Sequence, residues 1–111
     1  MEVKFFKQLN GCSPVKDFII NDLQPSDQKR VKSAIRRVYE QSHGLNNLFK
    51  AGYVKKLEKD IYELKPDRLR ILFTIKDEIC WLLHIFFKKS KKTPIKELDV
   101  ARQRKNIIYN N

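Results

Sequence analysis

The sequence has few of the residues that build disulfide scaffolds or metal sites. Its two cysteines, Cys12 and Cys80, lie far apart and belong to no CxxC pattern, so we expect two reduced thiols. The only histidines are His43 and His84, which form no HxxxH pair, and no Asp-rich cluster accompanies them. The chain also lacks a P-loop, a GxGxxG fingerprint and a GxSxG elbow. We therefore predict no metal ion and no cofactor, and we do not expect NTPase or dinucleotide-dependent chemistry.

Long hydrophobic runs are missing as well. The longest, residues 79–87, includes His84 and is far shorter than the roughly 20 apolar residues that a membrane-spanning helix needs. The N-terminal MEVKFFKQLN has neither the long apolar stretch nor the small-residue cleavage site of a secretory signal. We therefore expect a cytoplasmic protein with no membrane partner.

Acidic residues are outnumbered by basic ones, and this imbalance is the strongest signal in the composition. The 24 Lys and Arg residues against 13 Asp and Glu residues give a net charge of +11. Such an excess favours polyanionic partners, above all nucleic acid. An anionic membrane surface, an acidic protein partner or a surface charged only for solubility would explain the same number. At 111 residues, the chain is expected to form a single domain over residues 1–111.

The hydrophobic pattern changes along the chain from helical to alternating. Ser13-Pro14 is typical of a helix start, and Pro25 is expected to end this first helix. Ser26 is expected to cap a second helix. The predicted order is β-α-α-β-β-β-α, with strands at 2–8, 60–65, 68–76 and 79–88 and a last helix that starts at Thr93-Pro94. This is an α+β fold with an N-terminal helical hairpin and a C-terminal helix, packed on one face of a small antiparallel sheet.

Alternation along the predicted strands sorts their side chains onto two faces. Apolar rows are expected to meet the helices: Leu69, Ile71, Phe73 and Ile75 in one strand, Leu83, Ile85 and Phe87 in the next. The opposite face then collects cations, a carboxylate, an imidazole and a ring: Glu63, Lys65, Arg68, Arg70, His84, Phe86 and Lys88. Arginine binds phosphate and stabilises charge that builds up at phosphorus. Glu63 or His84 is a candidate for proton transfer, and Phe86 for base stacking. These residue types suit metal-free cleavage of RNA, in which the neighbouring 2′-OH is the nucleophile.

Simpler explanations exist for each of these features. Any solvated strand face carries charges, and Glu63 with Arg70 is equally explained as a cross-strand ion pair. A lone histidine near the middle of a sheet, such as His84, is more often a packed residue than a catalyst. The lysines at 88, 89, 91 and 92 would also serve to prevent aggregation at a strand end. Spacing alone therefore does not decide between a site and a charged surface.

Three segments resemble one known family. YELKPDRLRILF (62–73) and LLHIFFKKSKKTPIKELDVARQR (82–104) are similar to the HigB-type branch of the RelE/ParE toxin superfamily. NGCSPVKDFIINDL (10–23) resembles the entry of that branch into its first helix, so the similarity covers about residues 2–104. The sequence departs from the usual pattern at four positions: Lys65 in place of Arg, Phe73 in place of Tyr, Ile85 in place of Gly and Lys91 in place of Gln. Lys65 keeps its charge but loses the bidentate geometry of an arginine.

The resemblance implies a RelE-like fold and the toxin of a type II toxin–antitoxin system, an mRNA endonuclease that acts on messages in the ribosome. It implies an antitoxin partner, often a helix-turn-helix protein like HigA. Arg70 would stabilise the transition state, and Glu63 or His84 would move protons unless the lysines do so. The phosphate clamp would comprise Lys88, Lys89, Lys65 and Arg68. Ribosomal RNA would meet Lys55, Lys56, Lys91, Lys92 and the arginines of the second predicted helix, Arg30, Arg36 and Arg37. Two alternatives remain: a ParE-like toxin that poisons a topoisomerase, and a non-catalytic basic module that binds RNA or an antitoxin.

Overall fold

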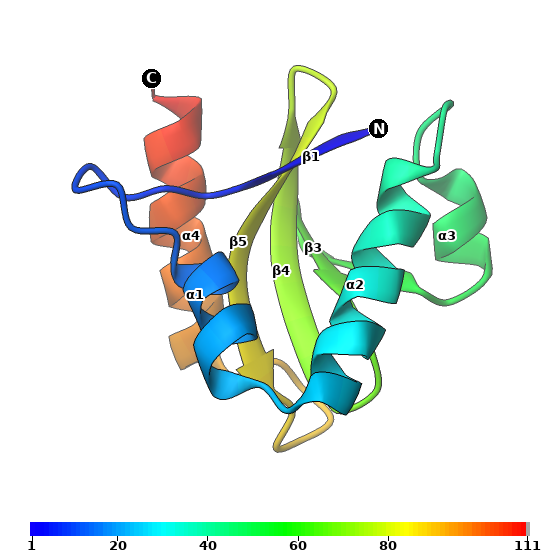
Figure 1. Ribbon diagram of the computed structural model, residues 1–111. Helices are drawn as coiled ribbons and strands as arrows, with labels where there is room; N and C mark the ends of the chain where they lie inside the picture. Colours follow the sequence, from blue (N-terminus) through cyan, green and yellow to red (C-terminus); the bar gives the residue numbers. More distant parts are fainter. Residues whose placement is uncertain (111) are drawn as a thin grey trace.

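The computed structural model describes residues 1–110, in which one mixed sheet lies between helices (Figure 1). The elements are β1 (Glu2–Phe5), α1 (Pro14–Asp22), α2 (Pro25–Tyr39), α3 (Asn46–Lys50), β2 (Val54–Glu58), β3 (Ile61–Leu64), β4 (Leu69–Lys76), β5 (Ile79–Phe87) and α4 (Ile95–Tyr109). The predicted α+β class is confirmed. The order adds α3 and β2 to the predicted elements.

The sheet has the strand order β1-β5-β4-β3-β2. Strands β2 to β5 are antiparallel to their neighbours, as expected, whereas β1 runs parallel to β5. The sheet is therefore mixed rather than purely antiparallel. The turn at Asp77-Glu78 joins β4 to β5 with both residues at positive φ, 54° and 64°, which is the backbone shape of a two-residue hairpin turn.

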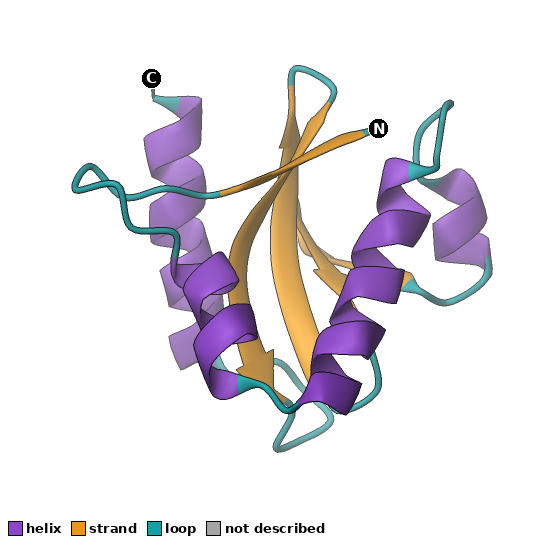
Figure 2. Cartoon of the chain, in the orientation of Figure 1, coloured by secondary structure: helices purple, strands orange, loops and turns teal. Residues whose placement is uncertain are grey.

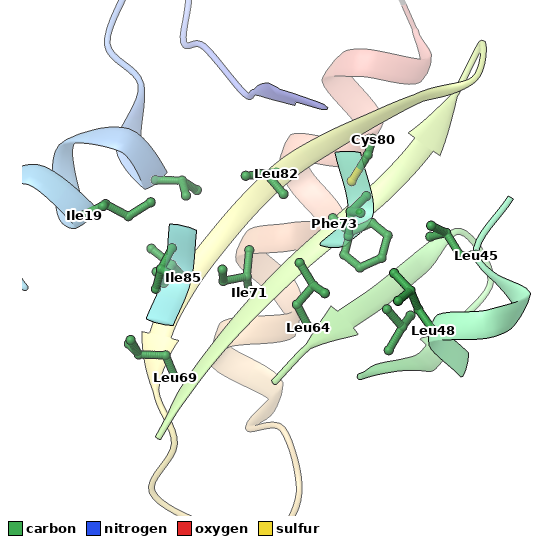
Figure 3. Close-up of a cluster of buried hydrophobic side chains, with 14 of the residues drawn as sticks. Ile19, Leu45, Leu48, Leu64, Leu69, Ile71, Phe73, Cys80, Leu82 and Ile85 are labelled. Atoms are coloured by element: carbon green, nitrogen blue, oxygen red, sulfur yellow. The ribbon is translucent and has the colours of Figure 1, made fainter. Parts of the chain in front are cut away.

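Helices cover both faces of the sheet, not one face as the pattern predicted. Helices α1 and α2 lie on one side and α4 on the other (Figure 2). We call the first side the hairpin face; its buried strand residues include Leu64, Ile71 and Phe73 (Figure 3). We call the second the α4 face, where Ala101 of α4 packs in a cluster with Leu72 and other buried residues. The sheet needs cover on both sides because both faces carry apolar side chains.

A bulge in β5 explains how the strand serves both faces. Leu72 lies opposite His84 while Phe73 lies opposite Leu82, so Leu83 is the extra residue in the ladder. Leu83 is buried, as predicted, but it joins the α4-face cluster while Ile85 belongs to the hairpin face. Simple alternation assigned Leu83 and Ile85 to the same face of the sheet, and this prediction was wrong for Leu83.

The two N-terminal helices follow each other closely, as the predicted hairpin requires. Leu23 and Gln24 alone separate them, and α2 begins at Pro25. Proline is well suited to a first helical position because its missing N–H would have no helical partner there. Pro25 therefore starts the second helix, and Ser26 lies inside it instead of capping it. Within residues 1–110, no helix is long and apolar enough to span a bilayer.

Candidate functional site

The β3–β4 turn and the β5–α4 loop meet at one end of the sheet, in the lower part of Figure 1. The backbone N–H of Lys88 donates to the carbonyl oxygen of Arg68 at 2.7 Å, which joins the loop to the start of β4. A small hollow opens here on the α4 face. We call it the Arg70 hollow; its lining is Glu63, Arg70, Phe86, Pro94 and residues 88–93 of the loop. It brings together four of the sequence-predicted site residues of highest interest: Arg70, Glu63, Lys88 and Lys89.

Glu63 is a buried carboxylate with both oxygens in use. The side chain is in β3, on the α4 face, and the residue is 5% exposed. Its Oε2 accepts a hydrogen bond from Thr93 Oγ1 at 2.7 Å, and its Oε1 lies 3.9 Å from Nε of Arg70. Glu63 therefore fixes the lysine-rich loop through Thr93 and holds the guanidinium group of Arg70 in place.

Arg70 is held from a second direction by the backbone. Its Nη1 donates to the carbonyl oxygens of Asp67 and Leu69 at 2.8 and 2.6 Å. The turn that supplies the first of these oxygens has Asp67 in the left-handed region, with φ of 55°. Arg70 also lies opposite Phe86 in the β4–β5 ladder. The guanidinium plane is therefore preorganised at the hollow, which is the property required of a group that stabilises developing charge.

Four lysines form the outer wall of the hollow. Lys88, Lys89, Lys91 and Lys92 are all exposed, and Ser90 Oγ donates to the carbonyl oxygen of Lys92 at 2.8 Å, which supports the turn of the loop. Together with Arg70 these lysines place five cations around the single carboxylate of Glu63. Such an arrangement attracts a phosphodiester far better than a metal ion. In the part of the chain that the structure describes, no group of three His, Cys, Asp or Glu side chains is arranged to hold a metal.

His84 lies on the predicted face, but α4 covers it. Its Nε2 is 3.1 Å from Glu97 Oε1, and its Nδ1 is 3.5 Å from Arg104 Nη1. The neutral tautomer with hydrogen on Nε2 satisfies both contacts, since it donates to the carboxylate and accepts from the guanidinium. Burial lowers the pKa of His84, which the bond to Glu97 offsets only in part. His84 therefore stabilises α4 against β5 and contacts the hollow only through its stacking on Phe86, at 5.5 Å between ring centroids.

Two cations predicted to share the site lie elsewhere. Arg68 donates to Asp27 Oδ2 at 2.9 Å and stacks over Phe87, so it belongs to the hairpin side of the molecule. Alternation assigned Arg68 and Arg70 to one face, but β4 begins only at Leu69, after a turn that breaks the extended backbone. Lys65 follows the end of β3 and lines a groove beside α2.

Strand β2, which the sequence pattern missed, places Lys55 and Lys56 on opposite faces of the sheet. Lys55 lies opposite Glu63 and Lys56 opposite Tyr62 in the β2–β3 ladder. Because directly opposed residues share a face, Lys55 joins the α4 face and Lys56 the hairpin face. Lys55 is therefore beside the Arg70 hollow, and Lys56 is not part of that surface.

Several residues of the site were not predicted as site residues. Thr93 was assigned only to the start of the last helix, yet it is the group that ties the loop to Glu63. Glu97 and Arg104 of α4 enclose His84. Their spacing of seven residues places them on one side of a helix, which is a sequence signal for a shared contact. No sequence signal connected that side to β5.

Comparison with known protein families gives a match. The family model described as Phage derived protein Gp49-like (DUF891) matches residues 19–106, a range that contains α2 to β5, nearly all of α4 and the whole Arg70 hollow. A search of curated proteins gives no match. Since the matched range is most of the sequence, the chain belongs to the phage-derived Gp49-like family, which is related to the RelE- and HigB-like toxins.

Proposed function

We propose that this protein is the toxin of a type II toxin–antitoxin pair and acts as a metal-independent endoribonuclease on ribosome-bound mRNA. Membership of the Gp49-like family is consistent with a toxin of such a system. The observation that carries the nuclease proposal is the Arg70 hollow. A preorganised guanidinium, a fixed carboxylate and four exposed lysines converge there on one small hollow, and the lysines are the groups that first meet an RNA phosphate in this proposal.

The proposed reaction uses the nucleophile that RNA itself contains. The 2′-oxygen attacks the adjacent phosphorus and loses its proton, and the bond from phosphorus to the 5′-oxygen breaks. The products are a 2′,3′-cyclic phosphate on one fragment and a 5′-hydroxyl on the other. Two negative charges build up on the non-bridging oxygens in the transition state, so cationic donors fixed in advance lower its free energy.

The geometry suggests a division of roles. Arg70 stabilises the pentavalent phosphorus, because its guanidinium is fixed by the turn and by Glu63. Lys88 and Lys89 bind the flanking backbone, and the lysines of this loop transfer the protons. Glu63 positions Arg70 and Thr93, since both of its oxygens are already engaged. His84 acts through the packing of α4 and Phe86. Phe86 itself is 7% exposed, so it supports the floor of the hollow more than it offers a face for base stacking.

The cations around the hollow supply docking on the ribosome. Lys91 and Lys92 are exposed on the loop, and Lys55 is exposed on the same face of the sheet. Each phosphate that they neutralise releases counterions, so binding should weaken steeply with salt. Toxins of the Gp49-like family usually pair with antitoxins. We propose a helix-turn-helix, HigA-like antitoxin for this chain, and action in the cytoplasm, where messages are translated.

The decisive experiment presents a defined message on ribosomes, kept assembled in their Mg²⁺ buffer, to purified protein that has been freed of bound metal with EDTA and then dialysed. The expected result is cleavage at discrete positions, with 2′,3′-cyclic phosphate and 5′-hydroxyl ends. A 2′-deoxy substitution at a cut position should abolish that cut alone. Expression in cells followed by primer extension provides the second readout. Intact message with damaged DNA would favour topoisomerase poisoning, and RNA that is bound but never cut would favour a non-catalytic module.

A further inference from the structure

A second cationic hollow lies beside α2, on the hairpin side of the molecule. It is a groove of about 410 Å³, within the roughly 300–1,000 Å³ that is typical of ligand sites. Its lining comes from α2, from the segment Leu64 to Asp67, and from Tyr53. The floor is apolar, with Ala34, Leu64 and Pro66. We call this hollow the α2 groove.

The rim of the α2 groove is strongly basic. Lys29, Arg30, Arg37 and Lys65 line it against one acidic residue, Asp67. Lys29 and Arg37 are two helical steps of four residues apart, so they lie on one side of α2. Arg30 pairs with both Asp27, at 3.3 Å, and Asp67, at 3.7 Å. Within residues 1–110, Lys29 and Lys65 pair with no carboxylate, which leaves both ammonium groups able to meet an external anion.

A stack of a guanidinium group on an aromatic ring lines the groove. The guanidinium carbon of Arg37 lies 4.2 Å from the centroid of the Tyr53 ring, and Tyr53 is 41% exposed. Guanidinium planes and tyrosine rings are the surfaces on which unpaired bases stack in RNA complexes. A groove that held only an acidic peptide would have no need of this planar pair. The combination of free ammonium groups with a stacked ring therefore fits a single-stranded nucleotide chain.

The α2 groove and the Arg70 hollow lie on opposite sides of the sheet and are linked through the β3–β4 turn. Asp67 lines the groove, and its carbonyl oxygen accepts the hydrogen bond from Arg70 in the hollow at 2.8 Å. The N-terminal end of α2, the β3–β4 turn and the β5–α4 loop gather at the same end of the molecule (Figure 1). A strand bound in the hollow therefore needs only to cross the β3–β4 turn to enter the groove.

From this continuity we propose that the α2 groove is a second RNA subsite, which holds message nucleotides that flank the cleaved phosphodiester bond. The proposal rests on the proposed function for the position of the cut, but binding in the groove is a separate property. Lys65 and Lys29 contact phosphates, and a flanking base extends the stack of Arg37 on Tyr53. Lys65, which the sequence pattern assigned to the Arg70 site, thereby has its RNA contact on the other side of the turn.

The test measures binding of a ten-nucleotide, fully 2′-O-methylated RNA, which the protein cannot cut, by fluorescence anisotropy. The double variant Lys29→Ala/Arg37→Ala should bind the RNA about tenfold more weakly than the parent. The slope of the logarithm of its binding constant against the logarithm of salt concentration should be smaller in magnitude by roughly 1 to 2. The matched control, Lys7→Ala/Lys16→Ala, removes two cations from a different hollow and should bind as the parent does. Circular dichroism confirms that each variant is folded.

Each outcome separates the two proposals. Unchanged binding by the Lys29/Arg37 variant, or an equal loss in the control, overturns the groove subsite whatever the cleavage results are. If the Lys29/Arg37 variant shows the expected tenfold weaker binding but the parent protein never cuts ribosome-bound message, the subsite stands and the nuclease function is overturned. Arg37→Lys keeps the charge but removes the planar group, so full affinity in that variant would contradict base stacking. A polyglutamate peptide that displaces the RNA at equal charge concentration would instead identify an acidic protein segment as the occupant.

Discussion

The two faces of the sheet are built on different principles. The hairpin face carries one large apolar cluster in which Leu64, Ile71 and Phe73 pack against α1 and α2. The α4 face has a smaller cluster, and polar groups alternate with its apolar ones: Glu63, Arg70, Thr74 and His84. Thr74 meets the hydroxyl of Tyr109 at 3.2 Å, so even a fully buried polar side chain here has a partner.

This difference shows how a small domain can combine stability with a site. The apolar cluster on the hairpin face supplies most of the hydrophobic stabilisation. The α4 face can therefore retain buried polar groups, whose desolvation is offset by hydrogen bonds to α4 and to the loop that precedes it. Helix α4 begins at Ile95, beyond the lysine-rich loop, so the end of the sheet with Glu63 and Arg70 is bordered by this loop rather than by the helix. A substitution should consequently affect stability on one face and activity on the other.

The largest effect is expected from Phe73→Ala on the hairpin face. Phe73 is fully buried, and its ring stacks on Tyr62 at 5.5 Å between centroids. Removal of such a ring should lower the free energy of unfolding by about 3–5 kcal/mol, through lost transfer energy and a residual cavity. Urea denaturation measures it. Tyr39→Ala, which removes a ring that is 64% exposed, is the control and should change stability by about 0.5 kcal/mol or less. Equal losses in both variants would refute the assignment of the core to this face.

The next effect compares two arginines that lie two residues apart. Arg70→Ala should lower the cleavage rate constant by about 10²–10³, because a fixed donor to the transition state is lost. Arg68→Ala should leave cleavage nearly unchanged but reduce stability by about 1–3 kcal/mol, because the buried carboxylate of Asp27 loses a donor at 2.9 Å. Single-turnover cleavage of ribosome-bound message and urea denaturation of both variants separate the roles. A larger cleavage loss in Arg68→Ala than in Arg70→Ala would contradict the placement of the two guanidinium groups.

This pair also shows what the sequence pattern can and cannot predict. Alternation correctly placed Glu63 and Arg70 on one face, because both lie inside regular strands. It failed for Arg68, which precedes β4, and for Leu83, which is the extra residue of a bulge, since the period of two holds only within an unbroken ladder. Strand order and the packing of α4 on the second face depend on contacts between distant segments. No local pattern contains that information.

The candidate site was predictable in its residue types more than in its contacts. The KKSKKTP segment identified the loop, but nothing in its spacing indicated that Thr93 would bond to Glu63. Likewise, His84 was a reasonable candidate for proton transfer until α4 placed Glu97 and Arg104 against it. Long-range hydrogen bonds decide whether a polar residue acts on substrate or supports the fold.

The smallest expected effect concerns the pH dependence of stability on the α4 face. Because burial lowers the pKa of His84 below its ordinary 6.5, the unfolded chain binds a proton there at higher pH than the folded chain does. The contribution of this residue is therefore fully present above about pH 6.5, and it is lost as pH falls from there through the lower folded pKa. The slope for one such group cannot exceed about 1.4 kcal/mol per pH unit.

His84→Gln removes this titration while it keeps a donor and an acceptor near Glu97 and Arg104. Urea denaturation at pH 7.5 and at pH 5.5 should show that the parent loses more stability on acidification than the variant does. His43→Gln removes the other imidazole, which is exposed, and serves as the matched control. If His84→Gln showed the same loss as the parent, or a larger one, the imidazole would not be held neutral between β5 and α4. The contrast between the two faces would then rest on Glu63, Arg70 and Thr74, without His84.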